Sequence, residues 1–303
     1  MYQSFDFKDV LASSAKAAWQ IEDVLPAGAK LDFTRRFLPE AIARTGEIAF
    51  LSDDEKRILN QIRGHEYLSL FGLVEEFILP FVLDHARPQL NGDDHRVRAL
   101  LNFASEEAKH IHLFKLFHQR FTEAFGTPCA AIGPAEAIAA EVLRHDPLSV
   151  ALVILQVEWM TQSHYVDSVR DDGDLDPLFK SLLKHHWMEE AQHAKLDTLM
   201  VEALADGRSK SEIKAAIDEY FEIAMFLDAG LKTQSSLNLA AFESAAGRTL
   251  PRHDHEAILA QQHQALRWTY IGSGLRHPKF RATLGAISPA QLARVDAAAP
   301  AFA

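Results

Sequence analysis

Two near-identical pentapeptides, 83 residues apart, constrain the fold and chemistry of this chain more than any other feature. They are Glu106–His110 (EEAKH) and Glu189–His193 (EEAQH), and each contains the spacing Glu-x-x-His. On an α-helix this spacing places both side chains on one face, a turn apart, where a carboxylate and an imidazole can bind one transition metal ion. A single pair arises often by chance, but two copies indicate a dinuclear centre inside a helical bundle.

A longer internal repeat supplies two further carboxylates. Glu75 and Glu158 are also 83 residues apart, and each follows a valine, Val74 and Val157. In both halves the isolated Glu precedes the Glu of the Glu-x-x-His motif by 32 residues. Two helices with one Glu each and two with Glu-x-x-His form the ligand set of a dinuclear four-helix bundle. The sequence therefore predicts two similar helix hairpins.

The turns of the two hairpins place the four carboxylates at one height. Glu75 and Glu107 lie 16 residues before and after Asn91, in a polar turn. The second half has nearly the same arrangement around Gly173. Because antiparallel helices rise equally per residue, positions equidistant from a turn lie level. All four carboxylates can therefore meet in one layer of the bundle.

Most of the chain has the pattern of helices, and Gly and Pro cluster at the breaks between them. We expect an all-α fold, a four-helix bundle with additional N- and C-terminal helices. The predicted helices are 52–85, 94–125, about 147–170, 177–206 and 208–232. The predicted regions are an N-terminal extension at 1–50, the di-metal bundle at 51–207, and a C-terminal helical extension at 208–303 packed on the bundle.

Composition excludes several classes of protein. The 303 residues carry a formal charge of −11, without a concentrated run of Lys and Arg, so we expect no nucleic-acid partner. One cysteine, Cys129, cannot form an internal disulfide or a Cys-based metal cluster. The longest uncharged apolar stretch, 77–83, is too short to span a bilayer. The first residues lack a basic region followed by an apolar run, so we expect no secretory signal and a cytoplasmic protein without a membrane partner.

Two of the carboxylate ligands, Glu158 and the one on the first helix, have alternatives. Glu158 lies in an apolar run, where an unpaired carboxylate would carry a large burial cost that a metal ion would remove. The alternative for Glu158 is an exposed helix edge. Glu75 and Glu76 compete for the remaining carboxylate position; the repeat favours Glu75, and Glu76 stays as the alternative metal ligand.

His186 extends the second motif beyond the minimal pattern. His186, Glu190 and His193 fall at positions i, i+4 and i+7, which form one line along a helix. His186 is therefore a candidate third nitrogen ligand, and a solvated histidine is an equal alternative. Glu107 and His110 would then serve one metal, and Glu190, His193 and His186 the other, with Glu75 and Glu158 as terminal or bridging carboxylates.

These residues resemble the ligand pattern of a known group of proteins. The set Glu75, Glu107-x-x-His110, Glu158 and Glu190-x-x-His193 is similar to that of the ferritin-like di-iron carboxylate superfamily. The added histidine four residues before Glu190 resembles the p-aminobenzoate N-oxygenase (arylamine N-oxygenase) group. The resemblance covers residues 55–205 and implies a ferritin-like bundle that holds two iron ions.

The resemblance also implies an activity. It is that of an O2-dependent non-haem di-iron oxygenase that N-oxygenates or hydroxylates a small organic substrate. An external electron donor is expected, because the chain has no cysteine cluster and no nucleotide-binding glycine motif. A homodimer and manganese in place of iron stay open. The alternatives are a ferritin-like iron oxidase or metal-handling protein and a manganese catalase-like enzyme.

Overall fold

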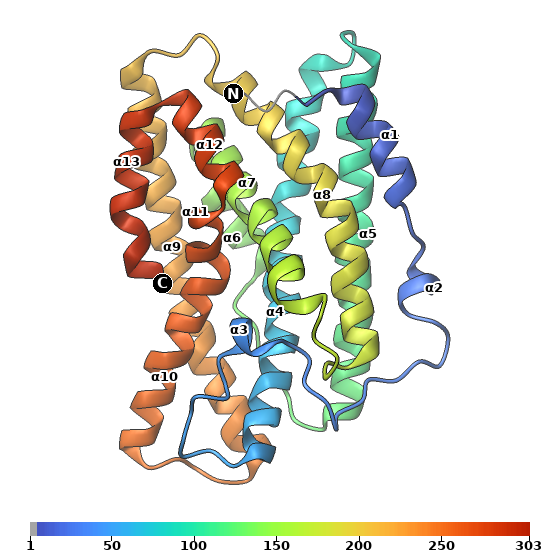
Figure 1. The fold of residues 1–303 in the computed structure, drawn as a ribbon, viewed down its shortest axis with the longest axis vertical. Helices are drawn as coiled ribbons and strands as arrows, with labels where there is room; N and C mark the ends of the chain where they lie inside the picture. Colours follow the sequence, from blue (N-terminus) through green and yellow to red (C-terminus); the bar gives the residue numbers. More distant parts are fainter. Residues whose placement is uncertain (1–4) are drawn as a thin grey trace.

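The structure, a computed structural model, describes residues 5–303 and is built from α-helices (Figure 1). Residues 1–4, where the expectation about a signal peptide begins, lie outside the described residues. Between residues 5 and 303 the chain forms no β-strand, and one isolated bridge joins Arg36 to Leu175. The predicted all-α fold is confirmed.

Two long helix hairpins form the centre of the molecule, as the repeat predicts. In the first hairpin α4 packs along α5, and in the second α7 packs along α8 (Figure 1). A turn of π-helix, Tyr165–Val169, extends α7. The bounds are α4 Asp53–Ala86, α5 Asp94–Phe125, α7 Pro147–His164 and α8 Pro177–Ala205.

Local sequence explains where these helices begin and end. The Ser52 hydroxyl caps α4 and forms a reciprocal capping box with Glu55. Asp146 and Asp176 cap α7 and α8, each followed by proline at the first helical position, where its missing N–H costs nothing. Helix α5 ends at Gly126, whose φ of 78° is a left-handed conformation that glycine adopts without strain.

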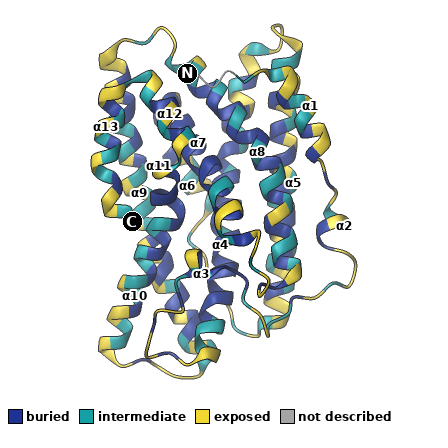
Figure 2. Cartoon of the chain, viewed as in Figure 1, coloured by how far each residue is buried: buried dark blue, intermediate teal, exposed yellow. Residues whose placement is uncertain are grey.

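Helix α7 is buried on every side along most of its length (Figure 2). Each residue from Leu148 to Thr161 is buried, including Glu158. Helices α8, α9, α11 and α12 pack around it. The carboxylate of Glu158 therefore lies in the interior of the protein, and the alternative of an exposed helix edge is wrong.

The N-terminal segment begins along α5 and α8 and ends, at α3, against α4 and α10. It contains α1 (Phe7–Ala17), α2 (Ile21–Val24) and α3 (Glu40–Ala43). Helix α1 packs against both α5 and α8, and α2 packs against α8. This placement brings residues near the start of the chain against the two helices that carry the pentapeptides (Figure 1).

Helix α9 is longer than the sequence predicts, since it runs from Lys210 to Ala246 instead of ending near residue 232. The polar run after residue 232 resembles a helix end, but part of it is buried against other elements. The Gln234 side chain, for example, accepts from the amide of Ile132 and donates to the carbonyl of Ala130. The helix ends at Gly247, which has a φ of 66°.

Helix α9 packs on α4, α7 and α10, and α6 packs on α4 and α7. Among residues 5–303, none of the helices has both the length and the apolar character that a bilayer span requires. The remaining elements are α6 Ala135–Leu143, α10 Arg252–Arg267, a π-helix at Trp268–Gly272 (η3), α11 Ser273–Arg276, α12 Pro278–Ile287, α13 Pro289–Ala298, and 3-10 turns at Arg87–Gln89 and Ala299–Phe302.

Two glycines inside α4 give a matched test of this packing. A Cβ added at Gly64 would lie 2.7 Å from the Cβ of Phe37, whereas one at Gly72 would lie 3.7 Å from the Phe114 ring. We predict that Gly64→Ala lowers the free energy of unfolding by about 1–3 kcal/mol through overpacking. Gly72→Ala should leave it unchanged or raise it by up to about 1 kcal/mol. Equal unfolding midpoints in urea would contradict this packing.

Candidate metal centre

Of the seven side chains predicted as metal ligands, six lie in two groups of facing ligand atoms, and the seventh, Glu158, is buried near Glu190 but belongs to neither group. None is more than 3% exposed, so the cluster is closed to bulk solvent. One comes from α4, two from α5, one from α7 and three from α8. They are Glu75, Glu107, His110, Glu158, His186, Glu190 and His193.

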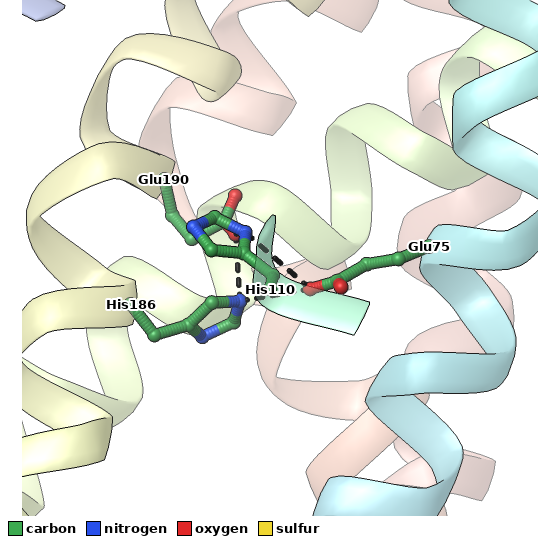
Figure 3. Close-up of side chains that lie close together, drawn as sticks. All are labelled: Glu75, His110, His186 and Glu190. Atoms are coloured by element: carbon green, nitrogen blue, oxygen red, sulfur yellow. Dashed lines mark hydrogen bonds and ion pairs between the residues drawn. The ribbon is translucent and has the colours of Figure 1, made fainter. Parts of the chain in front are cut away.

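Four of these residues form the first group, with ligand atoms within 4.8 Å of one another (Figure 3). His186 Nε2 lies 3.0 Å from Glu75 Oε1 and 2.6 Å from Glu190 Oε1. His110 Nδ1 lies 3.1 Å from the same oxygen of Glu190. Two imidazole nitrogens and two carboxylates therefore face one point, which is a donor set typical of iron, manganese or zinc.

A second group shares two members with the first and comprises Glu107, His110, Glu190 and His193. His193 Nδ1 lies 2.8 Å from Glu107 Oε1 and 2.9 Å from Glu190 Oε2. Glu190 thus turns one oxygen to each group, as a carboxylate between two metal ions does. His186 lies with His110 and Glu75, whereas the sequence analysis grouped it with His193.

Several buried polar atoms in this cluster lack a hydrogen-bond partner. Glu107 Oε1 and His193 Nδ1 are close in space, but their orientation is not that of a hydrogen bond. Buried polar groups without partners are rare, because each costs free energy. Ligand atoms that face the interior of the cluster without hydrogen bonds to one another are suited to bind metal ions there. These atoms are Glu75 Oε2, both Glu107 oxygens, His110 Nδ1 and Glu158 Oε2.

The first Glu of each pentapeptide holds the histidine of the other. His110 Nε2 donates to Glu189 Oε2 at 2.8 Å, and His193 Nε2 donates to Glu106 Oε2 at 2.9 Å. Each imidazole is thereby fixed with Nδ1 toward the centre, the arrangement that orients metal-bound histidines. The two Glu-x-x-His spacings alone do not predict this exchange, although the doubled Glu in both pentapeptides was a signal for it.

The N-terminal segment binds one of these outer carboxylates, and Lys109 of α5, which lies against that segment, binds the other. Ser14 Oγ donates to Glu106 at 2.5 Å. Lys109 Nζ lies 2.5 Å from Glu189 Oε1 and 3.9 Å from the ring centre of Trp19. The Trp19 ring also stacks on His110, with centroids 5.8 Å apart. Residues outside the bundle therefore fix the orientation of the central histidines.

Burial and mutual repulsion shift the proton affinities of the centre. Burial, with the nearby Glu107 carboxylate, raises the pKa of Glu75 to about 8. Burial alone would lower the pKa of His110, but Glu189 and Glu190 outweigh it and hold that pKa well above the usual range. Without metal, protons therefore compensate part of the buried negative charge.

Two other acidic residues of α4 lie outside the cluster. The Glu76 side chain is 33% exposed, and its Oε1 lies 3.3 Å from Lys115 Nζ. Glu66 is buried elsewhere, where it pairs with Arg63 and accepts from Tyr270. Of the two competing candidates, the structure brings Glu75 to the centre and leaves Glu76 at the surface.

Asp197 is a buried acidic neighbour of the centre that the sequence analysis missed. Neither of its carboxylate oxygens has a partner, and burial, with the Glu107 carboxylate, raises its pKa well above the usual range. It lies four residues after His193 and so continues the line of ligands along α8. The repeat gave no signal for it, since the corresponding position in the first half is Phe114.

The fold and the site define a helical-bundle protein with a buried dinuclear metal centre. The family model described as p-aminobenzoate N-oxygenase AurF matches residues 10–258, and the chain belongs to this family. The protein is therefore an enzyme of the non-haem di-iron oxygenase class, as the sequence predicts.

Solved structures of R2-like ligand-binding oxidase also match the chain. One, with an aerobically reconstituted Mn/Fe cofactor, is 14% identical, covers 89% of this chain and 97% of its own, and has a TM-score of 0.47. A variant with an Fe/Fe cofactor is 15% identical, with coverages of 86% and 93% and a TM-score of 0.47. No curated protein matches in sequence.

Metal binding by this centre should depend on pH. Protons on His110 and Glu75 compete with the metal, and they are lost as the pH rises toward the pKa of about 8 at Glu75. We predict that the affinity for Fe(II) rises between about pH 6 and 8, with release of protons on binding. Chelator competition and proton release in weak buffer would measure this. A pH-independent affinity would contradict the buried, protonated centre.

The outer carboxylates should matter for affinity although they do not face the centre. We predict that Glu189→Gln weakens Fe(II) binding by about 10–100-fold, because His110 loses its charged acceptor. Glu76→Gln is the matched control, since Glu76 lies at the surface, and it should bind as the parent does. Equal affinities of the two variants, by anaerobic titration, would show that Glu189 does not orient the site.

Proposed function

We propose that the seven converging residues bind two iron ions and that the protein uses O2 to N-oxygenate an arylamine. The observation that carries the proposal is the sharing of Glu190, with one oxygen in each group of ligand atoms. A carboxylate between two donor sets is what a dinuclear carboxylate bundle requires. The arylamine comes from the family, whose printed name is that of a p-aminobenzoate N-oxygenase.

Each part of the chain has a defined task in this proposal. Glu75, His110 and His186 would hold one ion, and Glu107, Glu158 and His193 the other, with Glu190 between them. An iron pair bound here supplies electrons to O2 and so activates it. Glu106 and Glu189 keep the two histidines fixed, and the apolar surroundings of Glu158 exclude water.

The reaction is balanced by an outside reductant. One atom of O2 forms a bond to the amine nitrogen and gives a hydroxylamine, and the other leaves as water. Two protons and two electrons are consumed, and we assign the electrons to an external donor protein. The lone Cys129 leaves the chain without a cysteine cluster of its own. We place this reaction in the cytoplasm. A homodimer stays open as the oligomeric state, and sedimentation of the purified protein would test it.

The test combines metal content with product analysis. The parent protein, loaded anaerobically with Fe(II), should bind two equivalents. After reduction and exposure to 18O2 it should transfer labelled oxygen to the nitrogen of an arylamine. Glu75→Ala should lose metal and this activity, whereas Glu76→Ala should keep both, since its side chain pairs with Lys115 at the surface.

Other outcomes favour the alternatives. Two metal equivalents with rapid peroxide disproportionation and no amine oxidation would support the manganese catalase-like reading. Iron oxidation without any organic product would support a ferritin-like metal-handling protein. One equivalent or none in the folded parent would contradict the dinuclear assignment.

A further inference from the structure

A largely apolar cavity of about 310 Å³ lies between α4, α7 and α9. The loop before α6 and the π-helix η3 complete its wall. Its volume is that of a pocket for one small organic molecule, at the lower end of the roughly 300–1,000 Å³ of such sites. The wall on α9 includes Phe226, Leu227, Gly230, Leu231 and Thr233.

The cavity reaches the two helices that carry the isolated carboxylates of the centre. Val74 and Val157 line it, and they directly precede Glu75 and Glu158. These valines are the matching positions of the 83-residue repeat. The cavity therefore adjoins the segments of α4 and α7 that carry Glu75 and Glu158, where α9 packs on both helices.

No residue that lines the cavity within the described chain carries a formal charge. Thr233, an exposed residue, contributes a hydroxyl whose proton is donated to the carbonyl of Ala229 at 3.1 Å, so that its oxygen can still accept. Tyr270 presents its ring, because its hydroxyl is already engaged as a donor to Glu66 Oε1 at 2.9 Å. The opening is apolar as well, since Phe226 lines it with 37% exposure.

This lining is unsuited to a carboxylate. Proteins recognise carboxylates through Arg or Lys, often in paired hydrogen bonds, and burial of the anion without such a partner is costly. Here no cation lines the wall. The chain is acidic overall, at −11, and two residues of the wall, Val74 and Val157, directly precede Glu75 and Glu158. An anion would therefore meet both desolvation and repulsion.

We propose that the substrate is an uncharged, apolar arylamine, without the carboxylate that p-aminobenzoate carries. The inference rests on the proposed N-oxygenation and names its substrate class. The aromatic ring binds between the aliphatic walls of α4, α7 and α9. A neutral polar substituent fits at the Thr233 rim, where it can meet a hydroxyl or water.

Binding without turnover tests the substrate class separately from the activity. The full-length, iron-loaded protein is titrated under argon with p-aminobenzoate, its methyl ester and p-toluidine, and binding is followed calorimetrically. The ester and p-toluidine should bind at least tenfold more tightly than p-aminobenzoate, which is ionised at neutral pH. Equal or tighter binding of p-aminobenzoate would overturn the proposal.

Two variants locate the binding at this cavity. Thr233→Arg adds a cation at the exposed rim, so it should tighten p-aminobenzoate binding at least tenfold, whereas the uncharged control Thr233→Gln should not. Gly230→Leu should fill the cavity and weaken binding of the methyl ester at least tenfold, with metal content unchanged. Two unchanged affinities would show that the cavity is not the binding site: that of Thr233→Arg for p-aminobenzoate and that of Gly230→Leu for the methyl ester.

The two proposals fail in different ways. Tight binding of the uncharged amines, with no oxygen transferred to them after reduction and exposure to 18O2, supports the ligand class of the cavity and contradicts N-oxygenation. Oxygen transfer to p-aminobenzoate in preference to its ester supports N-oxygenation and overturns the proposal that the substrate is uncharged.

Discussion

The structure depends on compensating four carboxylates that are buried together in an apolar bundle. Glu158 illustrates the constraint, since it lies in a helix whose residues from Leu148 to Thr161 are all buried. Such a group is costly as an anion without a partner. Protons offset part of the charge in the metal-free centre, as the raised pKa of Glu158 indicates. Metal binding replaces them, so folding and metal affinity are linked.

This constraint extends outward through the first Glu of each pentapeptide. The carboxylates of Glu106 and Glu189 bind the histidines from opposite motifs, so neither hairpin can orient its own imidazole alone. Ser14 and Trp19 then fix these contacts from the N-terminal segment. The dinuclear centre is consequently a property of the assembled bundle and its N-terminal cover, although its ligands occur in two local motifs.

Much of the fold and most of the site could be predicted from local spacing. Caps and prolines set the helix ends, and the 83-residue repeat selected Glu75 over its neighbour at the surface. The features that the sequence did not predict correctly depend on tertiary contacts. Helix α9 continues past residue 232 because Gln234 finds buried partners on the loop before α6. The grouping of His186 with His110 likewise follows from how α5 faces α8, which periodicity within one helix cannot reveal.

The departures from the repeat give the two metal positions different surroundings. His186 and Asp197 of the second half correspond to Phe103 and Phe114 of the first. Phe103 stacks on His193 with centroids 4.0 Å apart, and Phe114 meets His186 edge-on at 5.2 Å. One position thus has an additional imidazole donor, and the other lies toward Asp197. The repeated carboxylates would hold the two ions, and these four unequal residues would give the two positions different donors and neighbours.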